Sequence, residues 1–205
     1  MNKAKLKTAE RQFFKQYPEG FMSPEMVEIG KKHKMDKHIA FAQESFSKIA
    51  LKDVETTCEN MVKLVSRSSM VSLFEKPKFR DAVTSMNQDE KAELVSALRL
   101  LIHDDEEEGF NALLTILTRY KLAKWTLISV FRCYYYPSED LLFKPTTVKN
   151  VIKFFELEDL VYKPRSSYAF FVKYRSEINT MKAMCDPSLS PNNASFSGFL
   201  MMSME

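Results

Sequence analysis

Glycine is scarce in this chain of 205 residues. The only glycines are Gly20, Gly30, Gly109 and Gly198, and no two of them lie within nine residues of each other. Loops that wrap a phosphate with their backbone, and the tight turn of a dinucleotide-binding fold, need glycines in a cluster. A P-loop, a Rossmann fingerprint and a kinase-type glycine-rich loop are therefore excluded, and so is the GxSxG nucleophile elbow.

Cysteines are few, and long apolar runs are missing. Cys58, Cys133 and Cys185 lie far apart and form no CxxC motif, which predicts reduced thiols in a cytoplasmic protein. The longest apolar stretch, residues 125–131, includes two hydroxyl residues and is far too short to span a bilayer. The N-terminal residues lead into a polar helix with no apolar segment behind it, which is not the pattern of a secretory leader. We therefore expect a soluble chain that makes no membrane contact.

No pattern of metal ligands or catalytic residues is present. His33 and His38 are five residues apart, whereas a metal-binding pair on one helix needs a spacing of three or four. The acidic run 104–108 would radiate from a helix instead of converging on a cation, and it suits the positive end of a helix dipole. We expect no metal and no cofactor. No catalytic residue can be named, although residues distant in sequence can still assemble into a triad.

The charges are distributed unevenly although the net charge is only +3. Residues 1–53 carry 11 basic and 7 acidic side chains, a net charge of +4, and residues 54–110 carry 7 and 12, a net charge of −5. Residues 111–205 carry 12 and 8, again a net charge of +4. Two basic ends around an acidic middle favour dipolar steering or pairing within the chain over uniform attraction to a polyanion.

Apolar residues recur at spacings of three and four nearly throughout, which predicts helices and no substantial strand. Residues 87–90 resemble a capping box, and residues 122–136 are apolar on almost every side, so that helix should be the most buried. We predict an all-α chain of about ten helices in antiparallel pairs. The irregular bundle is slightly preferred over a short, HEAT-like curved solenoid, because no clean repeat is present. We expect a single domain over residues 1–205, with its weakest joint at residues 66–77.

The stretch from residue 119 to residue 182 is both basic and aromatic. It holds 14 of the 25 aromatic residues and 12 of the 30 lysines and arginines, with only six acids. Phosphate-bearing ligands and single-stranded nucleic acids are bound through this combination, since cations attract phosphates and flat rings stack on bases. A well-packed helical domain with a solvated basic face has the same composition.

Two similar helix starts lie 19 residues apart in this stretch. Residues 143–147 read Phe-Lys-Pro-Thr-Thr, and residues 162–167 read Tyr-Lys-Pro-Arg-Ser-Ser. Proline favours an extended conformation for the preceding lysine, and a helix N-terminus with nearby cations and hydroxyls attracts anions. The alternative is two ordinary capped helices with solvated lysines. The candidate anion-binding or nucleic-acid-binding residues are Lys144, Thr146, Thr147, Lys149, Lys163, Arg165, Ser166, Ser167, Lys173 and Arg175.

The run Tyr134-Tyr135-Tyr136 supplies candidates for base stacking. Successive helical residues turn by about 100°, so the three rings cannot all face the core, and at least one should be exposed or line a cleft. The alternative is that the rings pack inside and their hydroxyls form hydrogen bonds.

These observations lead to one hypothesis and two alternatives. The first is a non-enzymatic binding module whose basic aromatic C-terminal surface contacts nucleic acid or another phosphate-bearing partner. The second is a protein–protein adaptor or homo-oligomer that uses its Met-rich or acidic surfaces. The third is an enzyme acting on nucleic acid, such as a helical DNA glycosylase, with which the chain is compatible only in size and helix content. The first hypothesis loses its main support if six of its cations prove to be scattered around the molecule, namely Lys144, Lys149, Lys163, Arg165, Lys173 and Arg175.

Overall fold

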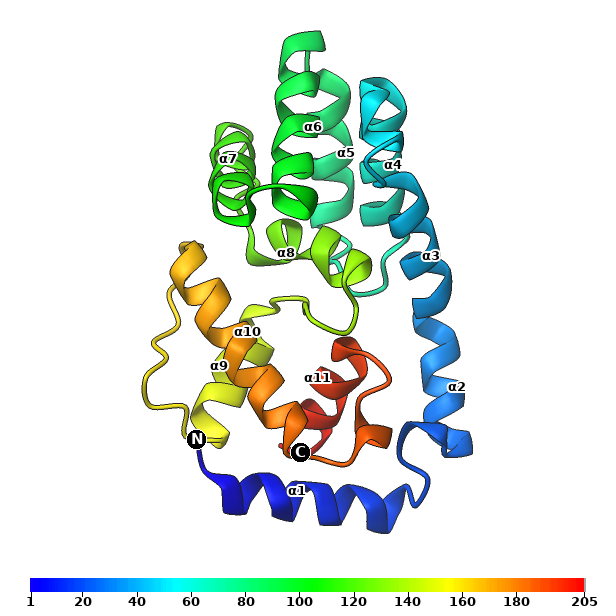
Figure 1. Cartoon of the computed structure of the whole chain (residues 1–205), viewed down its shortest axis with the longest axis vertical. Coiled ribbons are helices and arrows are strands. Elements are labelled where there is room, and N and C mark those ends of the chain that lie inside the picture. Colours follow the sequence, from blue (N-terminus) through cyan, green and yellow to red (C-terminus); the bar gives the residue numbers. More distant parts are fainter. Residues whose placement is uncertain (205) are drawn as a thin grey trace.

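The computed structural model describes residues 1–204 and is helical throughout, with no strand in that part of the chain (Figure 1). The all-α prediction is confirmed, and the eleven α-helices of residues 1–204 are close to the number of about ten expected. The α-helices are α1 (Lys3–Gln16), α2 (Pro24–His33), α3 (Met35–Ser45), α4 (Val54–Arg67), α5 (Glu75–Ser85), α6 (Gln88–His103), α7 (Glu106–Arg119), α8 (Trp125–Tyr135), α9 (Pro145–Phe154), α10 (Tyr168–Ala183) and α11 (Asn193–Met202). Three short 3-10 helices connect them: η1 (Gly20–Met22), η2 (Ala50–Lys52) and η3 (Pro187–Leu189).

Several helices begin at residues whose side chains accept the first free backbone N–H groups. The predicted capping box is present, since Asn87 Oδ1 accepts from the N–H of Glu90 at 2.9 Å and Glu90 Oε2 accepts from the N–H of Asn87 at 2.9 Å. Asp53 and Asp105 cap α4 and α7 in the same way. The junction of α2 and α3 differs, because only Lys34 separates them and it adopts the left-handed conformation with φ of 49°.

The helices form an irregular bundle in which the two ends of the chain meet (Figure 1). Helices α4 to α7 form one end, α2 and α3 run along one edge, and α1 lies crosswise below α9, α10 and α11. The N–H of Asn2 donates to the carbonyl of Phe155 at 2.7 Å, and the ring of Phe13 lies 5.4 Å from that of Phe199. Helix α1 therefore packs on the C-terminal helices, so the first and last helices of the chain are in contact.

Helix α8 crosses the middle of the molecule, and all of its residues from Trp125 to Tyr134 are buried. The expectation that this helix is the most buried is therefore confirmed. A chain of rings continues from it, with Trp125 stacked on Phe143 at 5.2 Å and Phe143 stacked on Phe171 at 4.8 Å. Much of the aromatic content of residues 119–182 is thus core packing between α8 and α10.

Helices α6 and α7 form a hairpin whose close approach depends on a glycine. A Cβ atom added at Gly109 would lie 2.0 Å from the backbone nitrogen of Leu101 and 2.6 Å from the carbonyl carbon of Leu100. No side chain can relieve that overlap, because the atoms it meets belong to the α6 backbone. Gly109 therefore sets the separation of the two helices.

We predict that Gly109→Ala lowers the free energy of unfolding by at least about 3 kcal/mol, because α6 and α7 must separate to admit the methyl group. The matched control is Gly30→Ala on α2, where an added Cβ meets nothing within 4 Å. That variant should be about 0.5–1 kcal/mol more stable, since alanine has the higher helix propensity. Urea unfolding monitored by circular dichroism measures both, and equal effects would contradict the prediction.

Candidate functional site

The two helix starts that resemble each other in sequence face different parts of the molecule. The start of α10 packs against α7, where Lys163, Arg165, Ser166 and Ser167 line one hollow. The start of α9 faces α11 instead, since the hydroxyl of Thr147 lies 3.4 Å from the sulfur of Met201. Lys144 lies near His33 at the end of α2, and Thr146 is exposed in the first turn of α9. The structure therefore brings together four of the ten candidates, all from the second helix start. The candidate cations do not all share one face, so a binding site is limited to the second helix start and its neighbours.

The hollow at the start of α10 has a volume of about 470 Å³. Glu107 and Asn111 of α7 form one wall, and Tyr168 in the first turn of α10 belongs to the other. The indole Nε1–H of Trp125 donates to the carbonyl of Lys163 at 3.1 Å, which anchors the segment leading into α10. Lys163 and Arg165 are thereby held at the rim, where both side chains are exposed.

Polar groups in this hollow are left without protein partners. Ser167 occupies the N-cap position of α10, but its side chain makes no capping hydrogen bond, so the first N–H groups of the helix have no side-chain acceptor. Ser166 is 3% exposed, and its Oγ has no hydrogen-bond partner among the described residues. Burying a hydroxyl without a partner costs about 1–3 kcal/mol, so this arrangement calls for a functional explanation.

Two further lysine candidates, Lys149 of α9 and Lys173 of α10, contact the segment that joins these helices. The Nζ of Lys149 lies 5.8 Å from the centre of the Tyr162 ring, which is half-buried against Phe170. The Nζ of Lys173 donates to the carbonyl of Asp159 at 2.8 Å. Lys173 therefore holds the segment in place, while Lys149 and Tyr162 form an exposed cation and a neighbouring ring.

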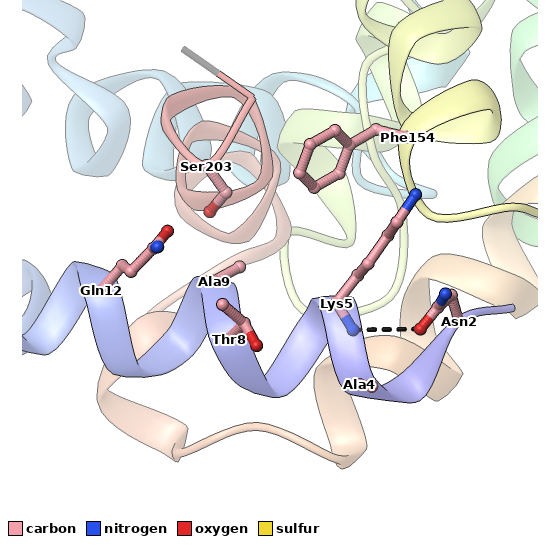
Figure 2. A pocket seen from close by; sticks show the side chains of 8 residues that line it. All are labelled: Asn2, Ala4, Lys5, Thr8, Ala9, Gln12, Phe154 and Ser203. Atoms are coloured by element: carbon pink, nitrogen blue, oxygen red, sulfur yellow. Dashed lines mark hydrogen bonds between the residues drawn. The ribbon is translucent and has the colours of Figure 1, made fainter.

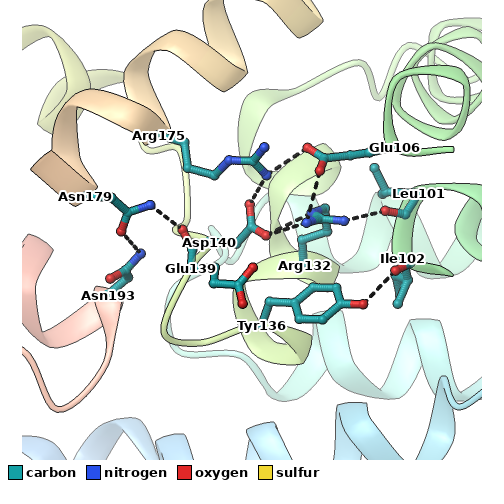
Figure 3. Close-up of polar contacts among 10 residues, drawn as sticks. All are labelled: Leu101, Ile102, Glu106, Arg132, Tyr136, Glu139, Asp140, Arg175, Asn179 and Asn193. Atoms are coloured by element: carbon teal, nitrogen blue, oxygen red, sulfur yellow. Dashed lines mark hydrogen bonds and ion pairs between the residues drawn. The ribbon is translucent and has the colours of Figure 1, made fainter. Parts of the chain in front are cut away.

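Arg175 is not part of the hollow, because it belongs to a buried network of charges (Figure 3). Asp140, which is 0% exposed, lies 2.7 Å from Arg175 and 2.8 Å from Arg132. Glu106 lies 2.7 Å from Arg175 and 3.1 Å from Arg132, and the carbonyl of Leu101 accepts from Arg132 at 2.6 Å. Arg175 is therefore paired inside the protein and is removed from the set of surface cations.

The three tyrosines proposed as stacking candidates all pack against other side chains or backbone of the protein, at different depths. Tyr134 is completely buried, and its hydroxyl lies 2.8 Å from the Oγ of Ser68. The half-buried ring of Tyr135 meets that of His103 edge-on at 5.2 Å. The half-buried Tyr136 donates its hydroxyl to the carbonyl of Ile102 at 2.8 Å and carries the Arg132 guanidinium over its ring (Figure 3). Packing with a bonded hydroxyl therefore describes Tyr134 and Tyr136, whereas Tyr135 packs only through its ring.

A second hollow of about 240 Å³ lies between α1 and the ends of α9 and α11 (Figure 2). Lys5, Thr8 and Gln12 of α1 line it, and Phe154 and Ser203 lie across from them. Lys5 forms an ion pair with Glu156 at 2.7 Å and lies over the Phe154 ring. No histidine, cysteine or carboxylate lines this hollow, so it offers no acid–base pair.

The cysteine thiols are not activated, and the described part of the chain holds no group of side chains arranged as metal ligands. Burial raises the pKa of Cys58 to about 11, of Cys133 to about 12 and of Cys185 to about 11, so these free thiols stay protonated near pH 7. Over residues 1–204, no three His, Cys, Asp or Glu side chains converge as metal ligands. In the same residues, no helix combines the length and the apolar character that crossing a bilayer requires.

The two histidines near α2 and α3 were not singled out as a site by sequence reasoning. The Nδ1 of His33 lies 2.9 Å from the Oγ of Ser69, and the ring of His38 packs 5.3 Å from that of Tyr134. Burial lowers the pKa of both imidazoles, and nearby lysines and an arginine lower it further. The run Lys31-Lys32-His33-Lys34 was the available signal, but it does not reveal which other cations lie beside it.

Comparison with known proteins found no matching family model, no matching curated protein and no matching solved structure. The geometry of the side chains is therefore the basis on which a function is proposed.

We predict that Asp140→Asn lowers the free energy of unfolding by about 3–5 kcal/mol, because two buried guanidinium groups then share a single carboxylate. The matched control is Glu93→Gln, which breaks the ion pair of Glu93 with Arg119 on the surface. Exposed pairs contribute about 1 kcal/mol or less. Denaturant unfolding of the two variants tests the difference, and a loss from Asp140→Asn no larger than that of the control would contradict it.

Proposed function

We propose that this chain is a non-enzymatic binding module for single-stranded nucleic acid, and that the hollow at the start of α10 receives one phosphate of the strand. The observation that carries the proposal is the group of unused donors in that hollow. Ser166, whose hydroxyl is buried directly behind the surface and has no partner, lines the hollow together with the uncapped start of α10 at Ser167 and two exposed cations. Phosphate oxygens are acceptors that suit each of these groups.

The charges at the rim favour an anion. Neither Lys163 nor Arg165 forms an ion pair or a side-chain hydrogen bond in the described part of the chain, so both remain free to contact a phosphate. The positive end of the α10 dipole adds to their potential. Glu107 is the one carboxylate that lines the hollow, and it lies on the opposite wall, where it is exposed to solvent. Two cations and a helix N-terminus outweigh one solvated carboxylate.

Rings beside the hollow favour a single strand over a duplex. Tyr168 lines the hollow and Tyr162 precedes Lys163, and both rings are half-buried, so part of each ring is open to a ligand. A base stacked on an aromatic ring contributes about 1–3 kcal/mol, and only an unpaired base presents its flat face. Lys149 lies next to Tyr162 and supplies a cation for a neighbouring phosphate. This arrangement supports binding without base-specific contacts.

We propose binding without catalysis because of what lines the hollow. Its side chains include a single carboxylate and neither a histidine nor a cysteine. A general acid–base mechanism needs two groups of suitable pKa near the reacting bond, and a nucleophilic mechanism needs a nucleophile with an adjacent base. The donors described above hold a phosphate but do not transfer protons at neutral pH.

We predict that Lys163→Glu/Arg165→Glu lowers the affinity for a labelled single-stranded oligonucleotide more than tenfold and makes log Kd less dependent on log salt concentration, since each lost phosphate contact reduces the slope by about 1. Fluorescence anisotropy between roughly 50 and 300 mM salt measures both quantities. The control, Lys3→Glu/Lys15→Glu, makes the same change of charge at two exposed lysines of α1. If both double variants weaken binding equally, only net charge is involved and the assigned site is wrong.

We predict opposite effects of Ser166→Ala on stability and on binding. The free energy of unfolding should stay the same or rise by about 1 kcal/mol, because the variant removes a buried hydroxyl that has no partner. The affinity for the oligonucleotide should fall roughly tenfold, because a hydrogen bond to a charged phosphate is lost. Urea unfolding and anisotropy on the same preparation test the pair of effects. A variant that is less stable and binds normally would show that the hydroxyl serves the fold alone.

A further inference from the structure

A second group of cations gathers where the segment between α4 and α5 meets α2 and α3. We call it the joint patch. It consists of five residues from five parts of the chain, namely Lys32 of α2, Lys34 between α2 and α3, Arg67 at the end of α4, Lys76 of α5 and Lys144 before α9. Within residues 1–204, none of the five lies within ion-pairing distance of a carboxylate, in contrast to most cations of α6 and α7.

The fold gathers these cations around two histidines. The contact between His33 and Ser69 joins the end of α2 to the segment after α4, and His38 packs on Tyr134 of α8. Lys144 and Lys32 are the charged groups that act on the His33 ring, and Arg67, Lys34 and Lys76 are those that act on the His38 ring. Because none of the five cations forms an ion pair within residues 1–204, the local potential is positive.

The acids closest along the chain do not neutralise the joint patch. Glu75 accepts a hydrogen bond from the hydroxyl of Thr126 at 2.8 Å, which turns it toward α8. Asp36 lies in the first turn of α3 and is exposed to solvent. Glu28 of α2 is paired with Lys31, which is not one of the five cations.

An exposed aromatic residue stands beside the joint patch. Phe74 is 82% exposed and its neighbour Leu73 is 78% exposed, and both lie just before α5, two and three residues ahead of Lys76. The N–H of Phe74 donates to the Oγ of Ser72 at 3.2 Å, which holds this turn. Phe74 is the one aromatic among the exposed large hydrophobic residues of residues 1–204, whereas the other rings are buried or half-buried.

We infer that the joint patch and Phe74 form a second contact for single-stranded nucleic acid, in which Phe74 stacks on a base and the cations bind phosphates on either side of it. The inference rests on the proposed function for its class of ligand but not for its place. In Figure 1 the start of α10 lies beside α7, at the edge of the molecule opposite α2 and α3. The two contacts therefore use different surfaces, and each can be removed without the other.

Charge and ring together favour nucleic acid over the other occupants of such a surface. An exposed flat ring among unpaired cations matches alternating bases and phosphates. The exposed imidazole of His33 adds a hydrogen-bonding group that a base or a sugar can use. An anionic membrane would instead use Leu73 and Phe74 together as an apolar anchor. A protein partner would bind the same two side chains with little dependence on salt.

The test compares Phe74→Ala and Lys34→Glu/Lys76→Glu with the wild-type chain, using anisotropy of a labelled oligothymidylate. The control for Phe74 is Ile49→Ala, which removes another isolated side chain that is 79% exposed. We expect a fivefold or greater loss of affinity from Phe74→Ala, in line with the stacking of about one base, and a larger loss with a flatter salt dependence from the lysine variant. Ile49→Ala should bind like the wild type, and unchanged unfolding midpoints confirm that all variants fold.

The outcomes separate this inference from the proposed function. Normal binding by both joint-patch variants, alongside weak binding by Lys163→Glu/Arg165→Glu, would overturn the inference and leave the α10 site intact. The reverse result would support the inference and overturn the α10 site. Absence of oligothymidylate binding by the wild type at low salt overturns both. Binding to phosphatidylserine vesicles that is lost in Phe74→Ala, with oligothymidylate binding unchanged, overturns the inference in favour of a membrane contact.

Discussion

The structure depends on a buried network of ion pairs between two arginines and two carboxylates. Its members are Arg132, Arg175, Asp140 and Glu106. These side chains come from α7, α8, the segment directly after α8, and α10, so the network joins three helices and one connecting segment (Figure 3). Charges taken out of water are tolerated only when each is compensated, which is why removal of one carboxylate affects the whole group. The same network sets the position of α10 against α7. Because Glu107 follows Glu106 directly and Tyr168 begins α10, the two walls of the candidate hollow are fixed by it.

The helices could be predicted from the sequence because their signals are local. Spacings of three and four and the box at Asn87 and Glu90 act within one or two turns, so they are visible without knowledge of the tertiary structure. From the sequence, Arg175 is predicted to lie among the surface cations, although the helical spacing around it indicates partial burial. Arg175 follows Phe171 by four residues and precedes Ile178 by three, so it lies on the face that those two residues bury. Its partner Asp140 lies 35 residues away and could not be identified from any pattern.

The composition of residues 119–182 has two physical origins that the sequence does not separate. Many of its aromatic residues serve the packing of α8 against α10, where Trp125, Phe143 and Phe171 are stacked. Its basic residues have two roles. Some, such as Arg175, belong to the buried network of ion pairs, and others, such as Lys163 and Arg165, lie on the exposed start of α10. The two matching helix starts illustrate the limit of a local comparison. Their residues are alike, but the contacts of Thr147 with α11 and of Ser167 with α7 give them different surroundings.

The uneven charge of the chain also has a structural explanation, which bears on where an anion can bind. Several acids of the acidic middle are paired within the chain. Glu106 meets two arginines in the buried network, while Glu55 meets Lys91 and Glu93 meets Arg119 at the surface. Most of the cations left without a carboxylate therefore come from the two basic ends, and tertiary contacts collect them at the start of α10 and around His33 and His38. A net charge of +3 conceals this separation, because the internal pairs cancel in the sum while the free cations act locally. Two positive surfaces on a nearly neutral chain attract a flexible polyanion more strongly than the total charge suggests, provided that the strand can reach both.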